Sequence, residues 1–256
     1  MKKLVLLFYS LFFLTLTFSQ DKKDAFKGGE SLRFKMSYSG FLRAGTAVLE
    51  VKETALNGKK VFHTIGTGWT SGMIKWFFEV DDVYESYFDK DTIKPYLFKR
   101  KIDEGGYLKH RITSFNYKAK TAYVQDFTTQ QDTSIAFNNV QDMLSSFYYL
   151  RTVDTKGLKK GDEIKLDMFL DSQVYPFKLL FLGREVLKTK FGKVNSLVFI
   201  PLVQSGRIFE AEESVKIWIT DDANKIPIKM TASLAVGSLR AELEAYKGLA
   251  NPFGEL

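Results

Sequence analysis

Apolar and polar residues alternate along most of this chain, in short segments separated by turn-forming residues, and this pattern constrains the fold more than any other feature. Successive side chains of a β-strand point to opposite faces, so a two-residue period predicts strands with one buried and one exposed side. We expect strands over residues 31–41, 46–54, 60–67, 79–88, 96–102, 107–117, 122–127, 134–137, 163–170, 173–188, 194–204, 213–220, 226–234 and 238–246.

The predicted fold is all-β and mainly antiparallel, because strands joined by short connections pair antiparallel with their neighbours. About a dozen strands in one meander form a strongly curved sheet or a half-open barrel. The turns are predicted at residues 42–45, 57–58, 104–106, 171–172, 191–193 and 223–225. Among them, Asn57-Gly58 is a strong hairpin signal.

One segment departs from the two-residue period. Its apolar residues recur at helical spacing, at Val140, Met143, Leu144, Phe147 and Leu150. We therefore predict one amphipathic helix over residues 140–153, capped by one of the two asparagines that precede it (138 or 139) and packed on the sheet. A helix lying on a membrane surface is the less favoured alternative, because its polar face carries no cluster of basic residues before position 151.

The N-terminus has a basic start followed by an almost wholly apolar run over residues 4–18. This layout is typical of a secretory signal peptide, and Thr17 and Ser19 place small residues three and one positions before a cleavage point at Gln20. We expect residues 1–19 to be removed on export. The run is short for a membrane-spanning helix, and an uncleaved N-terminal anchor is the alternative.

The mature chain is then predicted to have a flexible start over residues 20–28, a single β domain over 29–247 and a tail over 248–256. Cysteine is absent, which removes thiol catalysis, thiolate metal sites and the lipid-bearing cysteine of a bacterial lipoprotein. The predicted location is the periplasm or cell envelope, without a lipoprotein anchor. The net charge is +7, but the basic residues alternate with acidic and apolar ones, so we expect no nucleic acid partner.

Known catalytic motifs are missing from the sequence: it has no HExxH, no Gly-x-Ser-x-Gly and no phosphate-binding loop. The two histidines, His63 and His110, are far apart, and a metal site made from them with carboxylates is a disfavoured alternative. Acidic residues that are adjacent on a strand point to opposite faces and cannot act as a pair. We therefore predict no catalytic residues, no cofactor and no metal, and we do not expect an enzyme.

Register suggests one polar cluster on the inner face of the sheet. A three-residue loop over 104–106 sorts apolar from charged residues and sets Arg100 opposite His110. Extending the pairing upstream sets Tyr84 opposite Arg100, with Asp82 on the same face. Asp82, Tyr84, Arg100 and His110 are therefore candidate ligand contacts, although a satisfied structural network is the favoured interpretation.

A dense apolar segment lies over residues 67–80. Its large side chains are Trp69, Met73, Ile74, Trp76, Phe77 and Phe78. Core packing is the default interpretation, but five consecutive large side chains cannot all face one core from a single strand. We expect part of this segment to be exposed at a rim, where it contacts a ligand or a partner.

An ordered set of short motifs spans nearly the whole mature chain. They are GESLRFKMSYSGFLRAGTAVLEV (29–51), FEVDDVYESYFD (78–89), RKIDEGGY (100–107), VQDMLSSFYYLR (140–151), LGREVLKTKFGKVNSLVF (182–199), IWITDDANKIPIKM (217–230) and GSLRAELE (237–244). Together they resemble the DUF3108 family of exported bacterial proteins. The resemblance implies an all-β exported domain of unassigned role, with no catalytic residues to transfer. The strand, acidic turn and proline pattern is also similar, in architecture alone, to periplasmic lipoprotein carriers of the LolA type.

Two functional hypotheses lead. The first is a non-catalytic exported binding or carrier protein for an apolar ligand or a lipidated partner, which predicts an apolar cavity lined by strand residues. The second is a structural or assembly factor of the cell envelope, which predicts a filled interior and an external apolar patch near residues 69–78. A carboxylate hydrolase ranks third. The partner is unknown from sequence; lipid or lipidated protein, with peripheral contact with the outer membrane, is the expected class.

Overall fold

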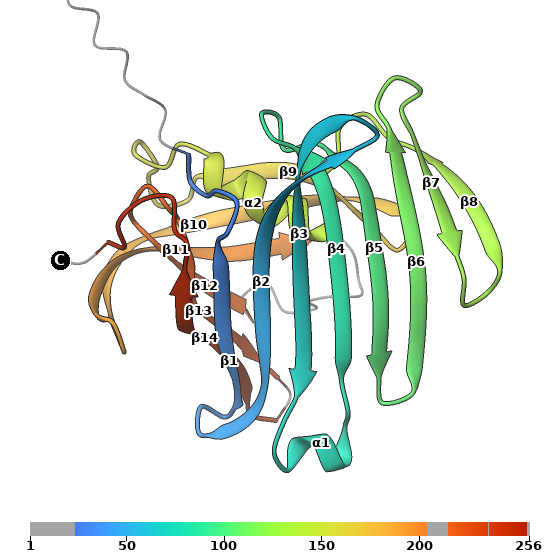
Figure 1. Cartoon of the computed structure of the whole chain (residues 1–256). Coiled ribbons are helices and arrows are strands. Elements are labelled where there is room, and N and C mark those ends of the chain that lie inside the picture. Colours follow the sequence, from blue (N-terminus) through green and yellow to red (C-terminus); the bar gives the residue numbers. More distant parts are fainter. Residues whose placement is uncertain (1–23, 204–214, 235, 255–256) are drawn as a thin grey trace, which may run out of the picture.

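The computed structural model describes residues 24–203, 215–234 and 236–254. The predicted signal peptide over 1–19 lies outside the described residues, as do residues 204 and 213–214 of two predicted strands. Fourteen strands form one sheet in which every neighbouring pair is antiparallel, as the alternation predicted (Figure 1). Two helices are described, α1 (Ile74–Phe77) and α2 (Met143–Thr152).

The strands follow the predicted segments closely. They are β1 (Ser31–Tyr38), β2 (Leu42–Leu56), β3 (Lys59–Thr70), β4 (Asp81–Asp89), β5 (Pro95–Glu104), β6 (Tyr107–Asn116), β7 (Thr121–Asp126), β8 (Gln131–Ala136), β9 (Glu163–Leu170), β10 (Gln173–Thr189), β11 (Gly192–Val203), β12 (Val215–Thr220), β13 (Pro227–Ser233) and β14 (Ser238–Lys247).

The sheet consists of two meanders, β1–β8 and β9–β14, joined where the first strand pairs with the last. It is not closed, because β8 and β9 form its two edges. The sheet curves strongly, and β9 and β10 cross behind β4 and β5 with α2 between the two halves (Figure 1). One core cluster accordingly joins Phe98 and Phe115 of the first meander to Leu144 of α2 and Phe169 of β9. Burial of these aromatic side chains holds the two halves together.

Helix α2 packs on the concave face of the sheet through Leu144 and Tyr148, as its apolar spacing predicted. The predicted cap and start were wrong. Asp142 is the cap: its carboxylate accepts hydrogen bonds from the backbone N–H groups of Leu144 and Ser145, at 2.9 and 2.8 Å, and the Ser145 hydroxyl completes a capping box. Among the described residues, no helix is long and apolar enough to cross a membrane.

The turn predicted at 42–45 lies earlier in the chain. Ser39 and Gly40 both have positive φ, at 48° and 81°, and make the tight turn, so β2 already begins at Leu42. Gly45 is a strand residue instead. A Cβ atom there would lie 2.4 Å from the carbonyl oxygen of Trp69, so glycine permits a close approach between β2 and β3.

The predicted register between β5 and β6 was also wrong. Gly105 and Gly106 alone form the loop, both with positive φ, as a two-residue hairpin turn favours. Arg100 therefore pairs with Arg111, and His110 pairs with Lys101 on the opposite face. The predicted alignment kept charged residues off the inner face. The structure places some of them there, where ion pairs with a distant turn, described below, compensate their charge.

Both ends of the described chain pack against the sheet, although the sequence predicted a flexible start and a tail. Ala25 and Phe26 are buried in a core cluster with Tyr148 of α2. Leu249 and Phe253 pack on a second cluster that includes β1, β13 and β14. Residues 24–28 and 248–254 therefore contribute to the core, and residues 20–23 and 255–256 lie outside the described part.

Candidate functional site

A buried ion pair anchors the end of α2. The side chain of Arg151 is 2% exposed and that of Glu30 is fully buried, and the two form a bidentate pair at 2.6 and 2.8 Å. Arg151 also donates to the carbonyl oxygens of Ala25 and Asn224. These bonds fix the last turn of α2 to the N-terminal segment and to the β12–β13 turn, which sets the width of the space between them.

An apolar cavity lies in this space, between α2 and strands β9 to β12. Its volume is about 210 Å³, and it is partly open. Aliphatic and aromatic side chains make most of the wall, which comprises Met143, Ser146, Phe147, Leu150, Arg151, Thr155, Ile164, Phe177, Leu179, Leu197, Phe199, Ile217, Ile219, Lys225 and Pro227. A partly open, mostly apolar space of this kind can take up an apolar ligand.

Two cations separate this cavity from a second, more polar cleft. Arg151 and Lys225 line both spaces, and the polar cleft has a volume of about 560 Å³. Its walls include the N-terminal segment and the β4–β5 turn, with Lys27, Glu53 and Asp91 among them. The apolar cavity therefore has charged groups at one end.

The predicted polar cluster forms only in part. Tyr84 pairs with Arg100 across β4 and β5, as predicted, and the Arg100 guanidinium lies over the Tyr84 ring at 5.8 Å. The Tyr84 hydroxyl donates to Asp82 at 3.4 Å. His110 does not join them, because the shorter loop turns it to the other face, where it stacks on Phe127 at 4.8 Å.

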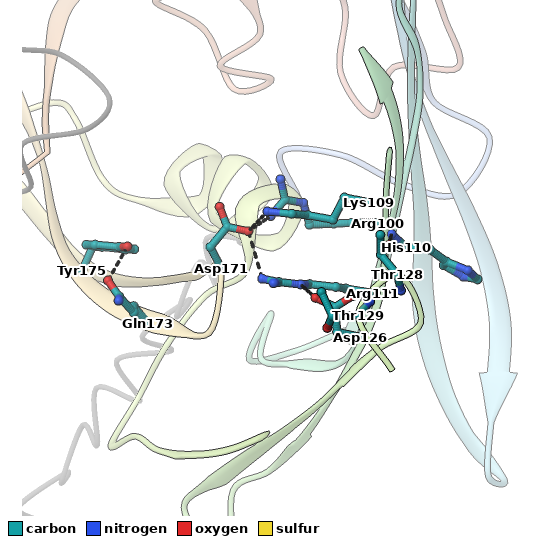
Figure 2. A network of polar contacts seen from close by, with 10 residues as sticks. All are labelled: Arg100, Lys109, His110, Arg111, Asp126, Thr128, Thr129, Asp171, Gln173 and Tyr175. Carbon is teal, nitrogen blue, oxygen red and sulfur yellow. Dashed lines mark hydrogen bonds and ion pairs between the residues drawn. The ribbon is translucent and has the colours of Figure 1, made fainter. Parts of the chain in front are cut away.

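The turn between β9 and β10 brings a carboxylate into this cluster (Figure 2). Asp171 accepts from Arg100 at 2.5 Å, from Lys109 at 2.8 Å and from Arg111 at 3.3 Å. Arg111 also donates to Asp126 at 2.6 Å. We call Arg100, Lys109, Arg111 and Asp171 the clasp. It connects β5 and β6 to the β9–β10 turn in the far half of the sheet.

Two carboxylates, Asp171 of the clasp and Asp82 near it, have pKa values that are shifted in opposite directions. Burial, together with the nearby Glu104 carboxylate, raises the pKa of Asp82 to about 6. Partial burial opposes ionisation of Asp171, but hydrogen bonds and charge from Lys109 and Arg100 outweigh it and hold the pKa of Asp171 below its usual value. The clasp therefore keeps its central carboxylate ionised.

The predicted apolar segment reaches solvent at one end of the sheet. Residues 74–77 form α1 rather than a strand, and Trp76 and Phe77 are each 84% exposed. Trp69, Met73 and Phe78 are also exposed, whereas Ile74 is half-buried. The core-packing interpretation was therefore wrong for most of this segment.

Exposed apolar residues from neighbouring turns gather at the same end, where α1 and the β1–β2 and β5–β6 turns lie together (Figure 1). Eleven of the fifteen large apolar side chains that the described residues expose lie here: Phe41, Trp69, Met73, Trp76, Phe77, Phe78, Tyr107, Leu108, Leu234, Val236 and Leu239, which we call the apolar rim. The turns at the opposite end carry polar residues instead, such as Asn57, Lys118 and Lys120. Turns are usually polar, so an apolar group of this size at one end of the sheet is unusual.

The other histidine, His63, contacts two side chains of the neighbouring strand β4. His63 pairs with Glu85 at 2.8 Å and stacks on Tyr87 at 4.0 Å. Burial lowers the pKa of His63 despite the Glu85 carboxylate. Within the described ranges, no group of three or more His, Asp and Glu side chains could hold a metal ion.

The carrier hypothesis predicted an apolar cavity lined by strand residues, but sequence reasoning did not place it beneath α2 and missed Arg151 and Lys225 in its wall. A charged residue at the end of an apolar helical stripe was the available signal for Arg151, because a buried arginine needs a partner. That partner, Glu30, is 121 positions away in the sequence. No local pattern could identify it.

The comparisons with known proteins identify the family. A model of the family described as "Protein of unknown function (DUF3108)" matches residues 33–244. The chain belongs to this family. No curated protein matches it.

One solved structure supports the architecture of this DUF3108 protein. It is similar to the crystal structure of a β-barrel-like protein of the DUF1849 family from Brucella abortus, with a TM-score of 0.56 and 13% identity, covering 85% of this chain and 96% of that one. A second match is the "putative lipoprotein" of Parabacteroides distasonis, with a TM-score of 0.34 and 10% identity, covering 89% of this chain and all of that one. At such identity the first match supports the fold alone, and the second carries no argument.

Proposed function

We propose that this DUF3108 protein is an exported, non-catalytic binding or carrier protein that holds the apolar chain of a ligand in the cavity beneath α2. The observation that carries the proposal is the cavity itself, whose wall consists mostly of apolar side chains, with the charged Arg151 and Lys225 among its few polar members. Its volume is below the range of about 300–1,000 Å³ typical of drug-sized ligands, so the occupant is a single narrow chain.

A chain-length series tests this proposal. Linear alkanols of increasing length are titrated into the purified mature protein by calorimetry. Each methylene that enters the cavity adds about 0.8 kcal/mol, which is roughly a fourfold gain in affinity, until the space is full. A plateau after several methylenes supports the proposal, whereas no binding, or affinity that rises without limit, contradicts it.

A filling variant makes the test specific to this cavity. Ile217 is half-buried on β12 and lines the cavity, so Ile217→Trp fills it with an indole ring. Val186 is exposed on β10, and Val186→Trp is the matched control. We expect the first variant to lose alkanol binding and the second to keep it, with thermal unfolding used to verify that both are folded.

The second candidate function is contact with an envelope surface through the apolar rim, as an assembly factor or a membrane-associated protein. Exposure of Trp76 and Phe77 at the tip of α1 favours it, because aromatic side chains of this kind concentrate at membrane interfaces. Vesicle flotation distinguishes the two functions. The variant Trp76→Ser, Phe77→Ser tests this function. If it no longer floats with vesicles but still binds alkanols, the rim contacts the surface and the cavity holds the ligand.

Export to the periplasm or cell envelope is part of the same proposal and rests on the N-terminal sequence. Cleavage before Gln20 gives a mature chain whose mass is measurable by intact mass spectrometry. A chain that retains residues 1–19 in the membrane fraction contradicts cleavage and supports the anchor instead.

A further inference from the structure

Lys225 is a half-buried cation that lacks the carboxylate partner of Arg151 and of the clasp cations, and, unlike the half-buried Lys94 and Lys229, it does not lie over an aromatic ring of a described residue. Arg151 pairs with Glu30, and the cations of the clasp pair with Asp171. Lys225 is half-buried, and among the described residues no carboxylate lies within 4.0 Å of its ammonium and none forms a hydrogen bond with it.

The β12–β13 turn fixes this lysine at the end of the apolar cavity. Its backbone is in the left-handed region, with φ of 47°, and its N–H donates to Asp222 at 2.9 Å. The preceding residue, Asn224, is fully buried and bonds to the backbone at Asn251 and Pro252. The turn therefore holds the position of the lysine without neutralising its side chain.

The carboxylates closest to Lys225 are committed elsewhere. Asp222 accepts from the backbone of its own turn and from Gly254, Asp221 pairs with Arg184 at 3.0 Å, and Asp154 accepts from the backbone of residue 156. Burial lowers the pKa of Lys225, and the charge of Arg151 acts in the same direction against these three acids. An anion placed beside the ammonium favours the charged form and acts against this lowering of the pKa.

We propose that the ligand is a single-chain amphiphile with an anionic head group, whose chain occupies the apolar cavity and whose head group pairs with the Lys225 ammonium. This inference rests on the proposed function and specifies the ligand class of that same site. Lysine binds carboxylate and phosphate groups as a point charge, and such charge-assisted bonds are stronger than neutral ones. The polar cleft that Lys225 also lines leaves room for the head group. Its wall carries the cations Lys27, Lys90, Arg151 and Lys225 and the carboxylates Asp24, Glu53, Asp91 and Asp154, so the head group must lie at the Lys225 side.

The test compares three probes with the same chain: dodecanoate, dodecanol and dodecylammonium, titrated into the mature protein by calorimetry below their micelle concentrations. We expect dodecanoate to bind about tenfold more tightly than dodecanol, and dodecylammonium to bind least. In Lys225→Met, which keeps the apolar stem, the preference for dodecanoate disappears while dodecanol affinity is unchanged. Lys216→Met, at an exposed lysine on β12, is the control and retains the preference.

The outcomes separate the two proposals. Equal binding of dodecanoate and dodecanol, or a preference that survives Lys225→Met, overturns the anionic head group and leaves the apolar site intact. Failure of all three probes to bind contradicts the proposed function itself, and this inference with it.

Discussion

Replacement of Arg151 by methionine tests the anchor that sets the cavity width. The Arg151 side chain makes four hydrogen bonds, two to Glu30 and one each to the carbonyl oxygens of Ala25 and Asn224. Arg151→Met keeps most of the side-chain volume but removes all four donors. The Glu30 carboxylate, which is fully buried, is then left without its counter-ion.

Removing one partner of a buried ion pair costs about 3–5 kcal/mol, because the remaining charge stays out of water without compensation. A domain is commonly stable by about 5–15 kcal/mol, so the loss is a large fraction of the total. We therefore expect Arg151→Met to lower the urea concentration at the unfolding midpoint strongly, with little change in the dependence of the unfolding free energy on urea. Tryptophan fluorescence at pH 7 measures this transition.

A double variant provides the control. In Arg151→Met, Glu30→Met, both charges are replaced by apolar groups of similar volume, which is often close to neutral for stability. Most of the lost free energy of unfolding should return. A single variant that loses less than about 1 kcal/mol, or a double variant less stable than the single, refutes the assignment of this pair as the anchor.

Three further predictions concern the clasp, its neighbour and the rim. Asp171→Asn should lower the free energy of unfolding at pH 7 by about 1 kcal/mol, as expected for a partly exposed network. Because the pKa of Asp171 is lowered in the folded protein, the difference in stability between the variant and wild type should shrink as the pH falls below about 4. A difference in denaturation midpoints that stays constant with pH argues against the clasp. Asp82 has a folded-state pKa of about 6, above its unfolded value, so its contribution makes the free energy of unfolding fall as the pH rises from about 4 to 6. Asp82→Asn should flatten this dependence of stability on pH. An unchanged pH dependence of unfolding contradicts the raised pKa of Asp82. The double variant Trp76→Ser, Phe77→Ser should have a free energy of unfolding within about 0.5 kcal/mol of wild type, measured by thermal unfolding, because both side chains are exposed. A larger loss of stability shows that α1 is part of the core.

The sequence predicted the strands and their antiparallel order well, because a two-residue period directly reports which side of a strand is buried. Helix α2 was also predicted from its spacing, although its start was placed too early. Residues 140–142 are extended, and Gln141 bridges to Met168 of β9 before Asp142 caps the helix. Sequence spacing alone could not separate this short extended piece from the helix that follows.

The polar sites were harder to predict because their partners are distant in the sequence. Asp171 lies 71 positions from Arg100, and no local pattern links a hairpin turn to a strand of the other meander. The loop at Gly105-Gly106 was misassigned for the same reason: the charged residues that it turns inward, Arg100, Lys109 and Arg111, all pair with that distant carboxylate. The curvature that brings the two meanders together is a property of the whole sheet.

The most direct test of the central claim is to map where an apolar chain sits on the protein. A dodecanoate analogue with a photoreactive group near the chain end is irradiated with the mature protein, and the labelled peptides are identified by mass spectrometry. Labels on α2 and on β11 or β12, around Leu150 and Ile217, are the predicted result. Labels confined to α1 and the other turns of the apolar rim would contradict a ligand held in the cavity.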